Sequence, residues 1–258
     1  MSTYLNELLN ENKFLFGVIC RDISSTDIEL LAQEGHKIVW FDIEHGSQSV
    51  EEVIRLGRLT THLGMISLAR IPELNRAYVQ RLLDGGIHIV NLPDIRSPAQ
   101  AYEFERLGKF PPVGERGVSS TSAGTGFSLG PNPKETFLLA NQRSNLMVMI
   151  ESDEGYECLD EILEVDGLDM IAVGHQDWAV SLGLFDKDGK KEISTKAEQV
   201  LRKSHDAGKI ISSSVSGPED ATYLADLGVR IMFTGVDVNL KRGAFADAIS
   251  GPLKVLGH

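Results

Sequence analysis

Cysteine is nearly absent from this chain, since Cys20 and Cys158 are the only two among 258 residues. One pair cannot build the framework of disulfides that stabilises small secreted domains, so a disulfide-rich fold is excluded. Reduced thiols are the rule inside cells, and we therefore expect a cytoplasmic protein. The N-terminal residues lack the apolar core of a secretion signal. The longest apolar stretches, such as Leu146–Ile150, are far too short to span a bilayer.

Basic residues are also scarce. Lys and Arg number 25 against 37 Asp and Glu, which gives a net charge of −12 and a pI of about 5.0. Binding to the phosphate backbone of nucleic acids needs a basic footprint, and docking on an anionic membrane needs one too. We therefore expect neither nucleic acid nor a membrane as a partner. Hydrophobic residues make up 42% of the chain, which is typical of a globular protein with a large core.

Short apolar runs alternate with amphipathic segments along most of the chain. The runs are continuous rather than alternating, which is typical of strands buried on both faces of a parallel sheet. The segments between them predict helices, and Ser49 with Glu52 and Thr195 with Glu198 have the spacing of capping boxes. The predicted strands are Phe14–Cys20, Lys37–Asp42, Met65–Arg70, Ile87–Leu92, Leu146–Ile150, Met170–Val173, Lys209–Ser213 and Arg230–Thr234, and the clearest predicted helices are Ser49–Leu63, Asn75–Asp84, Ser97–Leu107, Thr195–Ala207 and Glu219–Leu227.

A glycine precedes most of the predicted strands, as at Gly64 and Gly208. Glycine readily adopts the left-handed conformation that ends a helix, so each one marks a helix stop before a strand. Eight strands joined by helical crossovers match a (β/α)8 TIM barrel, with an open doubly wound sheet as the alternative. No linker composition marks a domain boundary, and we expect residues 1–258 to form one barrel domain.

The connection between the fourth and fifth predicted strands, Pro93 to Asn145, is much longer than the others. It contains one clear predicted helix, a turn rich in proline and glycine, and the Gly/Ser/Thr segment Val118–Gly130. Long irregular loops in compact domains usually serve as lids or binding loops. We expect a flexible lid, because the segment lacks the lysine of a phosphate-binding loop.

Two predicted strands lead directly into carboxylates. Glu151 follows the fifth strand and Asp177 follows the sixth, so their side chains are expected to converge at the carboxyl end of a barrel. Burying a lone carboxylate is costly unless it is paired or binds a metal. Two carboxylates without a cysteine favour a hard divalent cation such as Mg²⁺ or Mn²⁺. The alternative is that each residue only caps the helix that follows.

Two further polar residues lie at predicted strand ends. His45 follows the second strand, and its near-neutral intrinsic pKa makes it a candidate general base, with a surface loop histidine as the alternative. Arg70 ends the third strand. It is either a clamp for a substrate anion or a structural partner of Asp42 or Glu44.

Four motifs, in this order and spacing, resemble the HpcH/HpaI aldolase/citrate lyase family. The resemblance extends from about Gly17 to about Gly243 and is strongest to metal-dependent (class II) pyruvate aldolases such as 4-hydroxy-2-oxoheptanedioate aldolases. It implies a (β/α)8 barrel with a displaced or swapped last helix, a divalent metal (Mg²⁺, Mn²⁺ or Co²⁺), and a hexamer built from trimers. The motifs are Phe41–Gly46, Phe110–Gly117, Ile150–Ser152 and Val173–Gly183.

The resemblance also implies a role for each site residue. Glu151 and Asp177 would bind the metal, and the backbone at Gln176 and Asp177 would hold the carboxylate of pyruvate. Arg70 and the metal would stabilise the enolate as a 2-oxo-4-hydroxy acid is cleaved to pyruvate and an aldehyde. His45 would remove the proton from the C4 hydroxyl.

Asp84 would raise the basicity of His45, according to the same resemblance. However, Asp84 precedes the fourth predicted strand and so belongs to the N-terminal face of its own barrel. If the pair exists, Asp84 should come from a neighbouring subunit, which implies a homo-oligomer. The alternative is an ordinary aspartate in the turn that ends a helix.

Three positions depart from the family pattern. His175 stands where the family usually has proline, Met149 where some close members have a glutamine that contacts substrate, and Ser214 where the heptanedioate aldolases have a larger apolar residue. We therefore expect Ser214 to contact the aldehyde half and to favour a short or hydroxylated aldehyde. Two alternatives keep the fold: a lyase or hydrolase of acyl-CoA thioesters, as in the citrate lyase branch, and a non-catalytic barrel that binds oxoacids. A Schiff-base aldolase using Lys37 or Lys209 would need a lysine on the wrong face.

Overall fold

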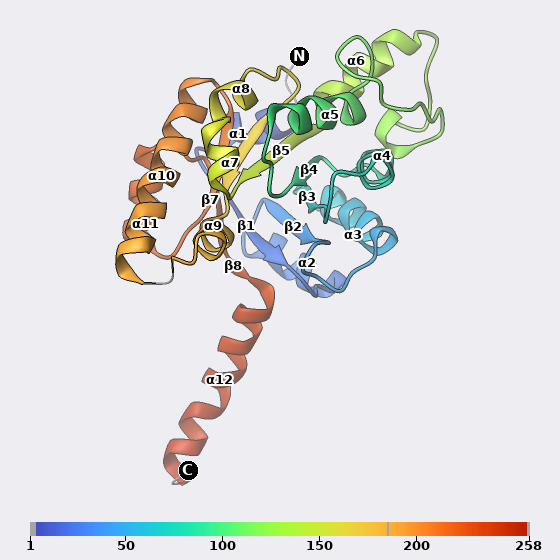
Figure 1. The fold of residues 1–258 in the computed structure, drawn as a ribbon. Helices are drawn as coiled ribbons and strands as arrows, with labels where there is room; N and C mark the ends of the chain where they lie inside the picture. The colour runs from blue at the N-terminus through green and yellow to red at the C-terminus, as the bar shows by residue number, and fades with distance from the viewer. Residues whose placement is uncertain (1–3, 185, 257–258) are drawn as a thin grey trace.

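The computed structural model describes residues 4–184 and 186–256 and shows a closed barrel of eight parallel strands in sequential order. The predicted TIM barrel is confirmed, and the open sheet is wrong, because β1 pairs in parallel with both β2 and β8. Each predicted strand is present within a few residues (Figure 1). The strands are β1 Leu15–Cys20, β2 Ile38–Asp42, β3 Ile66–Arg70, β4 Ile89–Leu92, β5 Asn145–Ile150, β6 Met170–Val173, β7 Ile210–Ser214 and β8 Ile231–Val236.

Helices surround the barrel and connect successive strands (Figure 1). An additional N-terminal helix, α1, contributes Leu5, Leu8 and Leu9 to the apolar cluster inside the barrel. The helices are α1 Tyr4–Glu11, α2 Ser25–Gln33, α3 Val50–His62, α4 Arg76–Gly85, α5 Pro98–Gly108, the 3-10 turn η1 Ala123–Thr125, α6 Pro133–Arg143, α7 Asp153–Glu157, α8 Leu159–Leu163, α9 His175–Ser181, α10 Lys187–Asp206, α11 Pro218–Asp226 and α12 Asp237–Leu256.

Two apolar clusters explain why the strand sequences are apolar at nearly every position. Ile38 and Trp40 of β2 point into the barrel, while Val39 and Phe41 pack against the surrounding helices. Inside the barrel, the ring of Trp40 meets that of Phe233 edge to face, with centroids 4.7 Å apart. Because both faces of each strand are buried, alternation of apolar and polar residues is lost.

One of the two predicted capping boxes is wrong. The Ser49 hydroxyl accepts the backbone N–H of Glu52 at the start of α3 as expected. Thr195, however, lies inside α10, where its hydroxyl donates to the carbonyl of Lys191. The helix begins earlier, and Asp186 caps it by accepting the backbone N–H of Gly189 at 2.8 Å.

The long connection between β4 and β5 contains more structure than the sequence predicts. Besides α5 it includes η1 and α6, and Arg116 fixes it to the body of the barrel. The Arg116 side chain is 1% exposed, lies over the ring of Phe110 and forms an ion pair with Asp84 Oδ1 at 2.6 Å. This buried anchor ties the connection to the end of α4.

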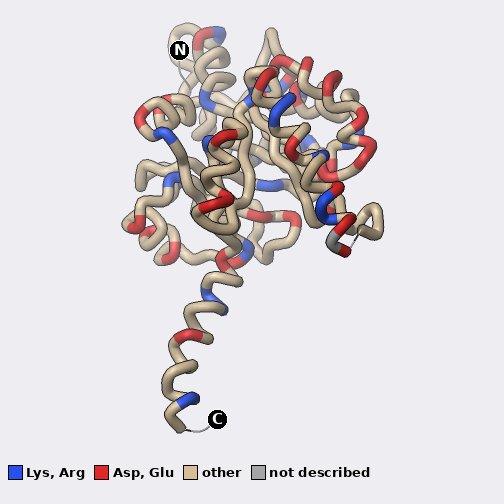
Figure 2. The backbone as a smooth tube through the Cα atoms, turned by 90° about the vertical axis from the view of Figure 1, so that its left-hand side faces the viewer, with Lys and Arg blue, Asp and Glu red and all other residues tan. Residues whose placement is uncertain are grey.

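The last helix, α12, projects away from the barrel, as Figures 1 and 2 show. Asp237 is its only buried residue among those described, and a row of apolar side chains along it is exposed: Val238, Leu240, Phe245, Ile249, Leu253, Val255 and Leu256. The prediction of a displaced last helix is therefore confirmed. Over residues 4–184 and 186–256, no helix combines the length and apolar character that crossing a membrane requires.

Candidate active site

A cavity of about 380 Å³ opens at the carboxyl ends of the strands. Residues in or directly after seven of the eight strands line it, together with Gly174 and residues of α9. The predicted site residues among them are His45, Arg70, Gln176, Asp177 and Ser214. The barrel therefore brings together residues from distant parts of the sequence, because parallel strands all place their carboxyl ends at the same mouth.

Arg70 is held at the end of β3 by two carboxylates. Asp42 lies directly opposite it in the register of β2 and β3. Asp42 Oδ1 accepts from Arg70 Nε at 3.0 Å, and Oδ2 accepts from Nη2 at 2.7 Å. Glu44 Oε2 lies 3.1 Å from Nη1. Arg70 is thus the partner of both Asp42 and Glu44, and it also lines the cavity.

The electrostatic balance keeps Arg70 positively charged. Burial alone would lower the pKa of Arg70, but the bonds and charges of Asp42 and Glu44 outweigh burial and raise the pKa. Burial likewise works against the ionised form of Asp42, yet bonding to Arg70 leaves its pKa below the usual value. Burial raises the pKa of Glu44 despite the nearby charge of Arg70. A fixed cation therefore faces the cavity in a partly desolvated setting.

His45 lies in the tight turn after β2. Its backbone N–H donates to Asp42 Oδ1 at 3.2 Å, so the carboxylate that orients Arg70 also fixes the backbone at His45. The imidazole Nε2 lies 3.6 Å from Glu44 Oε2, and the side chain is 47% exposed. The ring is therefore open to both the cavity and solvent, as proton exchange with a substrate hydroxyl requires.

Glu151, after β5, is a buried carboxylate with one unsatisfied oxygen. Oε1 accepts the backbone N–H of Asp94 at 2.6 Å, whereas Oε2 is buried and has no hydrogen-bond partner among the described residues. Burial raises the pKa of Glu151 to about 7, and the charge of Asp177 contributes in the same direction. An orphaned buried carboxylate oxygen beside a second carboxylate fits a bound cation.

Asp177 lies in the first turn of α9, is exposed and lines the cavity. No group of three or more His, Cys, Asp or Glu side chains in the described part of the chain is arranged to hold a metal. Two carboxylates suit a cation such as Mg²⁺ that keeps several oxygen ligands from water or substrate. The residues present therefore fit a hard divalent ion with an incomplete protein shell.

The other predicted residues occupy distinct parts of the mouth. Ser214 ends β7 and lines the cavity, as do Met149 and His175. Trp178 does not line the cavity. It is fully buried, and its Nε1 donates to Asp153 Oδ1 at 2.8 Å, so it is a packing residue.

Asp84 lies at the end of α4, before β4 begins, and is absent from the cavity lining. Its contact within the chain is Arg116. No lysine lines the cavity among the described residues, and Lys209 Nζ instead donates to the carbonyls of Val165 and Leu168. This placement gives no support to a Schiff-base mechanism.

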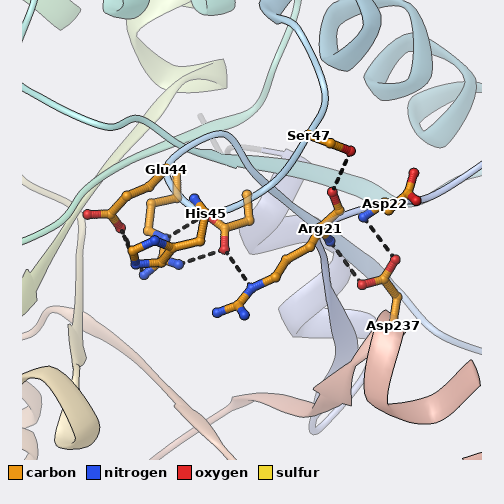
Figure 3. A network of polar contacts seen from close by, with 8 residues as sticks. Arg21, Asp22, Glu44, His45, Ser47 and Asp237 are labelled. Carbon is orange, nitrogen blue, oxygen red and sulfur yellow. Dashed lines mark hydrogen bonds and ion pairs between the residues drawn. The ribbon is translucent and has the colours of Figure 1, made fainter. Parts of the chain in front are cut away.

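One residue of the site was not predicted from the sequence. Arg21 follows β1, lines the cavity and donates from Nε to Asp42 Oδ2 at 3.4 Å. Figure 3 shows Arg21 in contact with Asp237 at the root of α12. A polar residue at the end of an apolar strand was the feature that pointed to Arg70 and Glu151. The same feature could have pointed to Arg21.

Comparison with known proteins decides the family. The sequence model that describes the HpcH/HpaI aldolase/citrate lyase family matches residues 24–244 of this chain. The chain belongs to the HpcH/HpaI aldolase/citrate lyase family. The resemblance inferred from the four motifs is thereby confirmed.

Two proteins to which the chain is similar are named as aldolases. The 2-keto-3-deoxy-L-rhamnonate aldolase of Klebsiella pneumoniae subsp. pneumoniae is 28% identical over 225 residues, which cover 87% of this chain and 83% of that protein. An HpcH/HpaI aldolase from Desulfitobacterium hafniense DCB-2 superposes with a TM-score of 0.88 at 26% identity, covering 98% and 97% of the two chains. Macrophomate synthase has a TM-score of 0.79 at 21% identity, covering 98% of this chain and 89% of that one, and shares the fold. The prediction of an aldolase agrees with this family.

Proposed function

We propose that this member of the family is a metal-dependent, class II aldolase that cleaves a 2-oxo-4-hydroxy acid to pyruvate and an aldehyde. The observation that carries the proposal is the pairing of a fixed cation, Arg70, with a buried carboxylate, Glu151, whose Oε2 has no partner, at one barrel mouth. Such a mouth provides positive charge where negative charge develops on an oxygen during carbon–carbon cleavage.

Glu151 and Asp177 would hold the divalent cation, which we propose to be Mg²⁺, Mn²⁺ or Co²⁺. A cation bound there would act as a Lewis acid toward the oxygens of the 2-oxo acid. The backbone N–H groups of Gln176 and Asp177 lie in the first turn of α9, where they have no carbonyl partner within the helix. Both residues line the cavity, so these groups would donate to the substrate carboxylate.

Residues of the chain carry out the proton transfer and stabilise the enolate. His45 accepts the proton of the C4 hydroxyl while the C3–C4 bond breaks and the aldehyde forms. The electron pair of that bond passes to the 2-oxo oxygen as an enolate, and the guanidinium of Arg70 stabilises its negative charge. Protonation of C3 then gives pyruvate. Asp42 serves by holding Arg70 and the backbone of His45 in one arrangement.

The aldehyde half is proposed to be hydroxylated. The 2-keto-3-deoxy-L-rhamnonate aldolases among the relatives act, by their name, on a deoxy sugar acid. Ser212 and Ser214, which share one face of β7, line the β7 side of the cavity. These hydroxyls support a preference for a short or sugar-derived aldehyde.

We further propose a cytoplasmic homo-oligomer, a hexamer built from trimers. The exposed apolar row on α12 supports burial against another subunit, and Asp84 would reach the His45 of a neighbour from the opposite face. Light scattering tests this assembly, because a fully active monomer would exclude a role for Asp84 at a neighbour's histidine.

The alternatives have less support. An acyl-CoA lyase or hydrolase would need several basic groups for the phosphates of CoA, whereas Arg21 and Arg70 are the only lysine or arginine residues among the described ones that line the cavity, and Arg70 is paired with two carboxylates. A non-catalytic oxoacid-binding barrel would not need His45 and Arg70 at the same cavity.

The deciding experiment is a cleavage screen of 2-oxo-4-hydroxy acids in which lactate dehydrogenase detects the pyruvate released. Each acid is tested in the presence and in the absence of EDTA. We expect cleavage that EDTA abolishes and added Mg²⁺ or Mn²⁺ restores. Absence of cleavage across the screen would overturn the proposed function.

A further inference from the structure

The cavity contains a second arginine that the steps above do not use. Arg21 directly follows β1 and lines the cavity together with Arg70. The side chain of Arg21 is 44% exposed, whereas that of Arg70 is 8% exposed. Two guanidinium groups therefore face one cavity, and Arg21 is the one that an incoming substrate can reach.

The backbone of Arg21 and the Nε atom of its side chain form hydrogen bonds within the chain. Its N–H donates to Asp237 Oδ1 at 2.9 Å, and its carbonyl accepts the backbone N–H of Ser47 at 3.0 Å. Nε donates to Asp42 Oδ2 at 3.4 Å. Figure 3 shows Ser47 and Asp237 both in contact with Arg21. A side chain fixed in this way loses little conformational freedom when it binds a ligand.

The outer end of the Arg21 guanidinium is available. Neither of its Nη atoms donates a hydrogen bond to a described residue, and none is drawn in Figure 3. Arg70 differs, because its Nε and Nη2 both bond to Asp42 and its Nη1 contacts Glu44. Paired N–H groups on a guanidinium match two oxygens of a carboxylate or a phosphate.

The nearby carboxylates are committed elsewhere. Both oxygens of Asp42 bond to Arg70 at 3.0 and 2.7 Å, shorter than the 3.4 Å contact to Arg21. Asp237 accepts two backbone N–H groups, from Arg21 and Asp22, and lies 3.6 Å from Lys241 Nζ. The charge of Arg21 is therefore only partly compensated.

The order of the strands places Arg21 across the barrel mouth from Glu151. In a closed barrel of eight strands in sequential order, β1 and β5 are four strands apart and lie across the barrel from each other. Glu151 follows β5, so Arg21 lies opposite the end where the 2-oxo acid is proposed to bind.

We propose that Arg21 is a specificity residue that binds a negatively charged group at the far end of the aldehyde half. The inference rests on the proposed aldolase function and narrows its substrate class. The substrate is a 2-oxo-4-hydroxy acid with a second anionic group, a carboxylate or a phosphate, and the released aldehyde carries that group.

The test uses two matched pairs of aldehydes in the synthetic direction with pyruvate. Glyceraldehyde and glyceraldehyde 3-phosphate differ by a phosphate, and butanal and succinic semialdehyde differ by a carboxylate. We expect the wild type to have the higher kcat/KM for the charged member of at least one pair. That pair identifies the anion. Arg21→Gln should lower the charged-to-neutral ratio by about 10- to 100-fold, which is the usual value of a charge-assisted hydrogen bond.

Two further variants control for charge and for the loss of any arginine. Arg21→Lys keeps a positive charge and should retain part of the ratio. Arg55→Gln removes an exposed arginine of α3 whose ion pair is with Glu52, and it should leave the ratio unchanged. If Arg21→Gln leaves both ratios where they are in the wild type, the proposal is overturned.

A binding measurement separates this inference from the aldolase proposal. Glycerol 3-phosphate and succinate are titrated calorimetrically into the wild type and into Arg21→Gln. Weaker binding of either probe to the variant supports the role of Arg21, and equal binding of both overturns it. If no aldehyde reacts with the wild type, the aldolase proposal fails, while the titrations still decide whether Arg21 binds anions.

Discussion

Gly174 packs so closely against Glu151 that no side chain fits between them. A Cβ built on Gly174 would lie 1.9 Å from Oε2 of Glu151 and 2.7 Å from its Cβ. Oε2 is the oxygen that has no partner among the described residues. Glycine at the end of β6 therefore lets the Glu151 carboxylate occupy the position from which it would bind a cation.

This contact predicts that Gly174→Ala displaces the Glu151 carboxylate. We expect weaker Mn²⁺ binding by titration calorimetry and a matching loss of aldol cleavage, because relief of a contact this short moves either the carboxylate or the start of α9. Gly243→Ala is the matched control, since a Cβ there meets nothing within 4 Å. Unchanged Mn²⁺ affinity in Gly174→Ala would count against Glu151 as a ligand.

Asp177→Ala should lose metal binding while the protein remains folded. The side chain is exposed and lies in the first turn of α9, so its removal leaves no buried charge unpaired. Circular dichroism and Mn²⁺ titration measure the two properties separately. Full wild-type activity in excess EDTA would exclude the metal mechanism and would favour a Schiff-base mechanism with a lysine nucleophile.

His45→Ala should slow the chemical step without changing metal affinity. Loss of a general base typically lowers kcat by about 10²–10⁴-fold. The His45 side chain lies beside Glu44, and its backbone N–H, which the substitution keeps, is the group that bonds to Asp42. Single-turnover cleavage and Mn²⁺ titration are the measurements. A kcat within about twofold of wild type would show that His45 is not the base.

The burial of His88 predicts that the folded protein loses stability in mild acid. Burial lowers the pKa of His88 from 6.5 to about 4, and its Nδ1 accepts the backbone N–H of Ser67 at 3.2 Å, which favours the neutral ring. Because the folded pKa lies below the unfolded one, the unfolded state binds a proton first as pH falls. Stability contributed by neutral His88 is therefore complete above pH 6.5 and declines by about 3 kcal/mol down to pH 4.

Urea unfolding at several pH values between 4 and 7.5 measures this effect. His88→Asn should reduce the fall in unfolding free energy across that range. His62→Asn, which replaces an exposed histidine of α3, should leave it in place. An identical pH dependence in His88→Asn and wild type would contradict the assignment.

The sequence predicted the barrel well because burial on both faces of a strand produces a continuous apolar run, which is a local signal. The same signal placed Arg70 and Glu151 at strand ends. It failed at Thr195, because a threonine with a glutamate three residues later occurs inside helices as well as at their starts. The true start of α10 depends on Asp186 and Gly189.

The position of Arg21 depends on contacts that no local sequence pattern contains. Asp42 comes from the next strand, and Asp237 lies 216 residues away in sequence. Only the closure of β1 onto β8 brings the start of α12 to Arg21. Likewise, Arg116 anchors the long connection through Asp84 on a different helix. Pairing across such distances follows from the completed fold.

Ser214 is predicted to favour hydroxylated aldehydes over unsubstituted ones of the same charge. It ends β7 and lines the cavity. A missing methylene changes discrimination by only about 1–3 kcal/mol, whereas a dedicated hydrogen bond to a substrate hydroxyl can contribute far more. Ser214→Leu removes the hydroxyl and adds apolar surface, so it should shift the preference toward unsubstituted aldehydes.

The measurement compares kcat/KM for glycolaldehyde and acetaldehyde in wild type and Ser214→Leu. The two aldehydes differ by one hydroxyl and carry no charge, so their ratio does not depend on binding of an anion at Arg21. Ser216→Leu is a control, because the Ser216 hydroxyl donates to Asp220 and is absent from the cavity lining. A wild type that already prefers acetaldehyde, or a ratio that Ser214→Leu does not move, would show that the β7 hydroxyl does not select the aldehyde.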